Sequence, residues 1–328
     1  MPVRGEPVEP VEWACPELAE RVEWAQEARQ ARRRLHDACA IMPDHITPVL
    51  TIALTAEIIL SLAGLVVWLL VALRPAVRTQ PARLAPWPVS FSDFLACALS
   101  VIGGGLFLQV LGRAISDPLL KKFSASHDTH IVVYGAAFQV GLLAGVAVAG
   151  SYLRTRWESR EASVPPRRGA CFLLLAGMLT FLAVLPVVYL TGYAWNQFLA
   201  WLGFPPEPQE LVEVFAHAKL SVSSVVLFLL ATITAPVVEE LIFRAGLFRY
   251  LRTRVPRWAA LTLPALFFAG LHVDWKTLSG LGSLAPLVVL AIIFSLAYER
   301  TGRIGVTMIA HAIFNLNMIL LIMVGMPA

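Results

Sequence analysis

The chain has 328 residues, of which 58% are hydrophobic and only 15% are charged. Soluble proteins are nearer a quarter charged, so this composition excludes an ordinary water-soluble globule. It also excludes a disordered chain, which would combine low hydrophobicity with high net charge. The net charge of +4 is typical of a membrane protein with Arg and Lys in its loops, and the four cysteines form no CxxC pair. We therefore expect a protein that crosses a membrane several times.

Eight stretches are nearly free of charge, and a helix needs about 20 apolar residues to cross a bilayer. They are residues 46–73, 94–112, 131–153, 169–206, 220–238, 258–273, 277–298 and 304–328. The stretch 169–206 is too long for one crossing, which predicts a helix to about Tyr193 and then a returning or surface segment. The stretch 258–273 is short for a crossing. The expected fold class is all-α, a polytopic transmembrane bundle of about eight helices.

Residues 1–45 differ from the rest, because they hold nine acidic residues and six Arg. Leu18, Val22, Ala25 and Ala28 recur at helical spacing. This pattern predicts an amphipathic helix on the membrane surface or against the bundle; a solvated helical tail is the alternative.

Basic residues gather in the loops 154–168, 249–257 and 300–303. Loops rich in Arg and Lys stay on the cytosolic side of a membrane. We therefore expect these three loops in the cytosol and the C-terminus outside.

Three charged residues follow the apolar stretch 220–238, namely Glu239, Glu240 and Arg244. Adjacent helical residues point about 100° apart, so the two carboxylates cannot share one partner. Glu240 and Arg244 have the i,i+4 spacing of a helical ion pair, which leaves Glu239 facing the bundle. The simpler alternative is that both glutamates mark the cytosolic end of a helix.

Other polar groups fall on apolar stretches at Glu57, His272, His311 and Asn315. Phe268 precedes His272 by one helical turn and would shield its ring from water, while His311 and Asn315 share a helix face. Each could instead be a hydrogen-bonded packing residue. Together with the glutamate pair, the two histidines and the asparagine favour a water-filled active site. Glu57 stands apart, and either an Arg of another helix or a cavity would account for it.

Three motifs, in this order, resemble those of the CPBP family of intramembrane endopeptidases. These are the CAAX-protease and bacteriocin-processing intramembrane endopeptidases, also called Abi proteins, and they include the type II CAAX prenyl endopeptidases. The motifs are Glu239-Glu240-x-x-x-Arg244, Phe268-x-x-x-His272 and His311-x-x-x-Asn315. The resemblance covers roughly residues 180–325 and implies hydrolysis of a peptide bond within the membrane.

The resemblance also implies a role for each residue. Glu239 would be the general base that activates water, and His272 would bind that water or move its proton. His311 and Asn315 would stabilise the oxyanion of the tetrahedral intermediate, which agrees with what amide hydrolysis requires. Supporting roles fall to Glu240, Arg244 and Phe268.

The residue types leave the question of a metal open, since a glutamate and two histidines suit zinc. The ligands would be Glu239, His272 and His311. However, the zincin pattern of two histidines at i,i+4 with Glu beside the first is absent. We therefore expect glutamate-based catalysis without a cofactor, with zinc as the alternative.

The implied organisation is a surface segment over residues 1–45, N-terminal membrane helices over 46–168 and a catalytic membrane domain over 169–328. The expected partners are a membrane-embedded or lipidated peptide and the lipid bilayer, not nucleic acid, and the expected location is the cytoplasmic membrane of a prokaryote. One alternative is a non-proteolytic scaffold of the same fold. Another is a proton-coupled transporter using Glu57 and Glu239, although the halves show no internal repeat.

Overall fold

The computed structural model describes residues 46–74, 84–123, 126–157, 169–205, 215 and 221–325. The predicted amphipathic segment 1–45 lies outside these residues. The chain divides into two compact units, Met1–Ile52 and Ala53–Ala328, and the contacts described below lie within the second.

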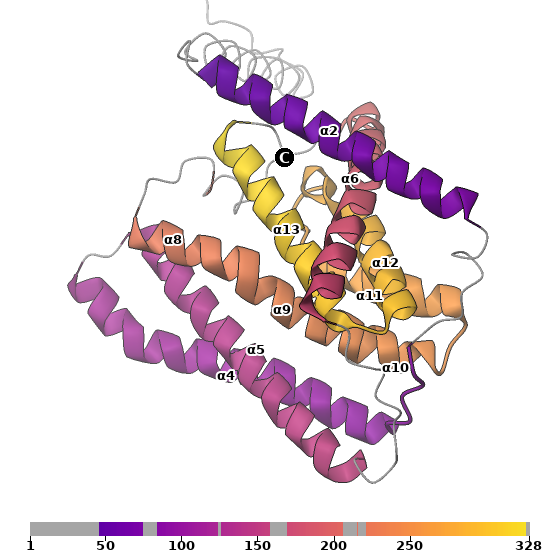
Figure 1. The fold of residues 1–328 in the computed structure, drawn as a ribbon. Coiled ribbons are helices and arrows are strands. Elements are labelled where there is room, and N and C mark those ends of the chain that lie inside the picture. Colours follow the sequence, from indigo (N-terminus) through magenta and orange to yellow (C-terminus); the bar gives the residue numbers. More distant parts are fainter. Residues whose placement is uncertain are drawn as a thin grey trace, which may run out of the picture. The chain divides into compact units, whose positions relative to one another are not determined.

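Every regular element among the described residues is helical, which confirms the all-α fold class (Figure 1). The α-helices are α2 (Ile46–Leu73), α4 (Phe91–Lys122), α5 (His127–Trp157), α6 (Ala170–Trp201), α8 (Val222–Leu229), α9 (Ala235–Glu239), α10 (Arg249–Arg252), α11 (Arg257–Gly270), α12 (Leu284–Thr301) and α13 (Ile304–Met323). Two π-helical segments, η1 (Leu230–Thr234) and η2 (Glu240–Phe248), and the 3₁₀ turn η3 (Ser279–Leu281) complete the set.

Seven of the described helices are long and apolar enough to cross a membrane, close to the expected eight. They carry large apolar side chains on their outer surfaces, such as Leu190 at 70% and Trp201 at 79% exposure. Exposure of so much apolar surface to water would be unfavourable, whereas its contact with lipid tails is not. The protein is therefore an integral, multi-pass membrane protein.

Two predicted boundaries are wrong. First, α6 is one continuous helix to Trp201 rather than a helix to Tyr193 followed by a returning segment. Its end coincides with Gly203, whose φ of 90° lies in the left-handed region that glycine adopts easily. Absence of charge cannot locate such an end, because lipid-facing and interfacial residues can both be uncharged.

Second, the helix that begins at Val222 does not end near Glu239. It continues through η2 and α10 to Arg252, so both glutamates lie in its interior. The alternative that they mark a helix end is therefore wrong. A search for uncharged residues stops at the first carboxylate even when the helix continues past it.

The stretch 258–273 forms α11, whose 14 residues are too few for the crossing predicted there. Its position is nevertheless fixed, because Arg252 before it and Arg257 at its start both pair with Glu299 near the end of α12. The start of α11 therefore lies beside the end of α12, and the two helices run in opposite directions.

Ion pairs and hydrogen bonds bring the three basic loops to one end of the bundle. Arg156 lies 3.1 Å from Asp93 at the start of α4, and Arg254 donates to the carbonyl of Val89 just before α4. Since Glu299, next to Arg300, contacts the segment that contains Arg254, the described ends of the three basic regions lie at one end of the bundle. Their common placement agrees with the expectation that they share one side of the membrane.

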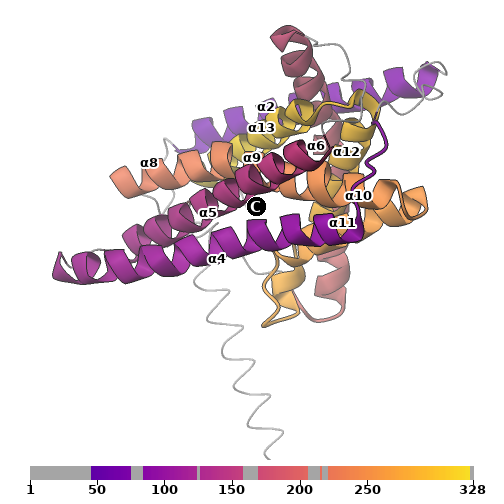
Figure 2. The same ribbon diagram turned by 90° about the horizontal axis from the view of Figure 1, so that it is seen from below.

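Helices α4 and α5 lie side by side along their length (Figures 1 and 2). Glycines allow this close packing, because a Cβ on Gly145 would lie 2.4 Å from the carbonyl oxygen of Ser100. The Ser100 hydroxyl donates to the Gly145 carbonyl at 2.9 Å. Small residues at such a contact are typical of helix packing in membranes.

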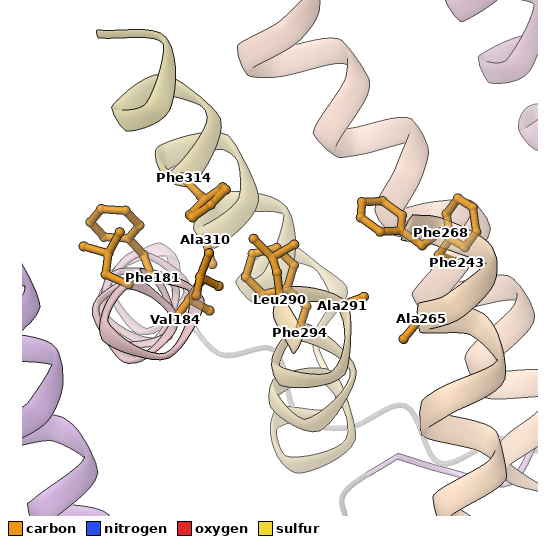
Figure 3. Packing of buried hydrophobic residues seen from close by; sticks show 12 residues of the cluster. Phe181, Val184, Phe243, Ala265, Phe268, Leu290, Ala291, Phe294, Ala310 and Phe314 are labelled. Atoms are coloured by element: carbon orange, nitrogen blue, oxygen red, sulfur yellow. The ribbon is translucent and has the colours of Figure 1, made fainter. Parts of the chain in front are cut away.

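A cluster of apolar side chains from α6, η2, α11, α12 and α13 forms the core around the polar group described below. Figure 3 shows Phe243 and Phe268 near each other, and their rings make an edge contact with centroids 5.1 Å apart. Phe294 of α12 also belongs to this core and is completely buried. The core thus fixes three helices that carry the candidate site residues.

Candidate active site

The two adjacent glutamates occupy different environments, as their spacing predicts. The side chain of Glu240 is fully buried, while that of Glu239 is 20% exposed. They lie at the junction of α9 and η2, and π-helical segments flank α9 on both sides. Such segments are rare and occur frequently at functional sites, so the local backbone itself singles out this position.

Glu240 connects two helices through an ion pair and a charged hydrogen bond. Its Oε1 lies 2.9 Å from Nη1 of Arg244, which confirms the ion pair expected at i,i+4. The same oxygen accepts from Nδ1 of His311 on α13 at 2.9 Å. Since all three side chains are at least 96% buried, the Glu240 carboxylate neutralises an arginine and holds the imidazole in one orientation.

His311 consequently presents its other nitrogen to Glu239. With Nδ1 donating to Glu240, Nε2 of His311 lies 3.6 Å from Oε2 of Glu239. Residues 71 positions apart in sequence thus meet because α13 packs against the segment that contains both glutamates.

His272 approaches Glu239 from a second direction. It lies just after α11, which ends at Gly270, rather than within a helix as expected. Its Nδ1 donates to the Phe268 carbonyl at 2.7 Å, and its Nε2 lies 3.6 Å from Oε1 of Glu239. Burial opposes a positive charge on this ring, but the Glu239 carboxylate and the Phe268 carbonyl outweigh burial and raise the pKa of His272.

The Phe268 ring packs against both histidines. Its ring centroid lies 4.4 Å from that of His272 and 6.1 Å from that of His311. The Arg244 guanidinium lies 4.8 Å from the centroid of the Phe268 ring. This cation–π contact stabilises the buried positive charge without adding another charged group.

The directions of these hydrogen bonds define the chemistry of the centre. A carbonyl and an ionised carboxylate only accept, so both histidines carry hydrogen on Nδ1. In neutral rings both Nε2 atoms are acceptors, and they face the two acceptor oxygens of Glu239. At 3.6 Å these atoms are too far apart for direct hydrogen bonds. A water lying beside them that donates to both atoms, or protonation of the ring, would supply the missing hydrogen.

Asn315 lies one turn after His311 on α13. Its Nδ2 donates to the Ala231 carbonyl in η1 at 2.9 Å. In a π-helix that carbonyl would bond the N–H five residues later, as Leu230 does with Ala235, but residue 236 is proline and has no N–H. The carbonyl is thereby available to Asn315, which the structure places beside η1 rather than against Glu239.

Residues 221–317 match a family model, Type II CAAX prenyl endopeptidase Rce1-like. The match is consistent with a CPBP family intramembrane protease. It confirms the resemblance and supports a CAAX-type intramembrane protease in general. Searches of curated proteins and of solved structures found no match. The matched segment contains all three motifs and both π-helical segments.

The part of the chain that the structure describes contains no group of three His, Cys, Asp or Glu side chains arranged to hold a metal ion. Glu239, His272 and His311, the ligands of the zinc alternative, nevertheless lie close to one another. Each histidine faces a different oxygen of Glu239.

The structure places Glu57, for which the sequence offered either an arginine of another helix or a cavity, against two neutral hydrogen-bond donors. Glu57 accepts hydrogen bonds from the Tyr189 hydroxyl on α6 and from Nδ2 of Asn317 on α13, at 3.0 and 3.2 Å for the latter. No described arginine pairs with it, and its side chain is buried. Tyr189 and Asn317 were not predicted from the sequence as partners of Glu57, because only charged residues were considered as partners and both of these are neutral donors.

Proposed function

We propose that this protein hydrolyses a peptide bond of a membrane-associated or lipidated substrate, with Glu239 as the general base. One observation carries the proposal: Glu239 is partly exposed and lies 3.6 Å from Nε2 of both His272 and His311. The neighbouring carboxylate, Glu240, is fully buried and already paired. Only Glu239 is therefore able to meet both a water molecule and a substrate.

The proposed reaction begins with a water held between Glu239 and His272. Glu239 takes a proton from this water as its oxygen attacks the scissile carbonyl carbon, and His272 helps to pass the proton to the leaving amine. His311 donates from Nε2–H to the oxyanion while its Nδ1–H stays on Glu240. The His311 ring therefore carries both hydrogens, and with them a positive charge, before the attack, and the two carboxylates compensate that charge.

Asn315 would be the second oxyanion donor. Its Nδ2 carries two hydrogens, and the bond to the Ala231 carbonyl uses one of them. That bond would orient the amide so that the second hydrogen is available to the intermediate. Supporting roles fall to Glu240, which orients His311, to Arg244, which neutralises Glu240, and to Phe268, which excludes water from the rings.

The test is Glu239→Gln, which removes the base while preserving size. The matched control is Asp274→Asn, the same acid-to-amide change at an exposed position two residues after His272. Purified variants would be assayed on a prenylated CAAX peptide and on a bacteriocin leader peptide. We expect cleavage to fall by about 10²–10⁴-fold in Glu239→Gln only, the usual contribution of a general base.

A comparison of the host membrane proteome with and without Glu239→Gln would identify the substrate class, because uncleaved precursors accumulate. Normal turnover of both peptides and of the precursors by Glu239→Gln would contradict the proposal and favour a scaffold. The proposal also holds that catalysis requires no metal ion. Stoichiometric zinc in the purified protein, together with loss of cleavage on chelation, would replace it with the zinc alternative.

A further inference from the structure

A cavity of about 330 Å³ lies at the end of the bundle that carries the basic loops, apart from Glu239. One wall is the extended segment 84–86 before α4, which contributes apolar side chains. The other wall combines Arg249, Arg252 and Thr253 with Glu299 from α12. Binding pockets for small molecules start near this size, whereas a single water occupies only about 30 Å³.

The charges around this cavity do not balance. Glu299 is the acidic residue of its lining, and it is already held by Arg252 at 2.5 Å and by Arg257 at 2.8 Å. Arg254, close by, donates to the carbonyls of Val89 and Tyr250 rather than to an acid. The lining and its immediate neighbours therefore carry more positive than negative charge.

Arg249 supplies the excess charge within the cavity itself. Its guanidinium lies 5.4 Å from the centroid of the Trp87 ring and beside the Tyr298 hydroxyl, both uncharged groups. Its Nε is buried and has no hydrogen-bond partner among the described residues. A buried donor of this kind costs free energy unless a ligand or water accepts from it.

We propose that this cavity binds the phosphate of an anionic phospholipid from the cytosolic leaflet. The guanidinium fork of Arg249 matches two phosphate oxygens, and Thr253 offers a further donor. The apolar segment 84–86 suits the glycerol and upper acyl chain. The positive-inside rule places this end of the bundle at the cytosolic surface, where anionic lipids are available.

The experiment measures lipid binding by the full chain in detergent, with native mass spectrometry during titration with phosphatidylglycerol or phosphatidylcholine. We expect Arg249→Gln to weaken phosphatidylglycerol binding about tenfold, as loss of one charge-assisted contact does. The matched control is Arg300→Gln, the same change at an exposed position of the same face but outside the cavity. It should alter binding less than about twofold, since exposed charges are strongly screened.

Arg249→Lys is a second variant, which tests the proposal even if glutamine at this position disturbs folding. It keeps the charge but loses the fork, so phosphatidylglycerol should bind with intermediate affinity. Equal weakening by Arg249→Gln and Arg300→Gln would show diffuse surface attraction and overturn the proposal, as would equal binding of the two lipids. Inorganic phosphate that displaces the lipid at comparable concentration would overturn the lipid assignment in favour of a soluble anion. None of these readouts depends on peptide cleavage.

Discussion

Glu240→Gln should destabilise the protein far more than the same change one residue earlier. Glu240 and Arg244 are 0% and 1% exposed and lie 2.9 Å apart. Removing the carboxylate leaves a guanidinium buried without a counter-charge. Breaking a buried ion pair in this way costs about 3–5 kcal/mol of unfolding free energy.

The assay is denaturant unfolding of the purified protein in detergent, and the chain supplies its own control. Glu239→Gln makes the same acid-to-amide change at a partly exposed position without an arginine partner in contact, so we expect a loss below about 1 kcal/mol. The double variant Glu240→Gln/Arg244→Met removes both charges and should recover much of the stability lost by the single variant.

Two results would refute this reasoning. Equal stability of Glu240→Gln and Glu239→Gln would mean that the ion pair does not stabilise the folded state. Strict additivity in the cycle formed by Glu240→Gln, Arg244→Met and the double variant would mean that the two side chains are not energetically coupled.

Three further variants test other contacts. Glu57→Leu leaves the partly buried donors of Tyr189 and Asn317 without this acceptor and should cost about 1–3 kcal/mol in all. Glu57→Gln keeps an acceptor and should cost less in the same unfolding assay. Gly145→Ala forces α4 and α5 apart and should lower the unfolding free energy by about 1–3 kcal/mol. The control Gly150→Ala on the same helix meets open space and should be neutral or stabilising. Equal effects of the two variants would contradict the close packing of α4 on α5. Phe268→Leu removes the ring beside Arg244 and should lower the unfolding free energy by about 1–2 kcal/mol, and an unchanged value would show that the cation–π contact contributes nothing.

Hydrophobic patterning alone predicted the membrane location and most of the helices. Residues 46–73 form α2 as expected, and stretches within α4, α5, α12 and α13 were also found. These predictions succeed because the bilayer requires a long uncharged run wherever a helix crosses. The ion pair of Glu240 with Arg244 was predictable for a similar reason, since four residues along a helix bring two side chains to one face.

Tertiary structure decided what local spacing cannot encode. The helix containing Glu239 continues to Arg252, and inside it Arg244 and His311 compensate the buried carboxylate of Glu240. Only the packed bundle provides the second of these partners. The partners of Glu57 come from two distant helices, and nothing in its local sequence indicates them.

The sequence by itself thus determined that the chain is a membrane-spanning helical protein and which few polar residues stand out from its apolar stretches. Those facts follow from the lipid bilayer, which requires every crossing segment to be apolar, whatever the other segments do. Only the tertiary structure decided which of the two glutamates is buried, which nitrogen of each histidine faces Glu239, and that the segment 249–253 lines a cavity together with Glu299. These depend on helices that are far apart in sequence, and side chains meet there only when the bundle packs.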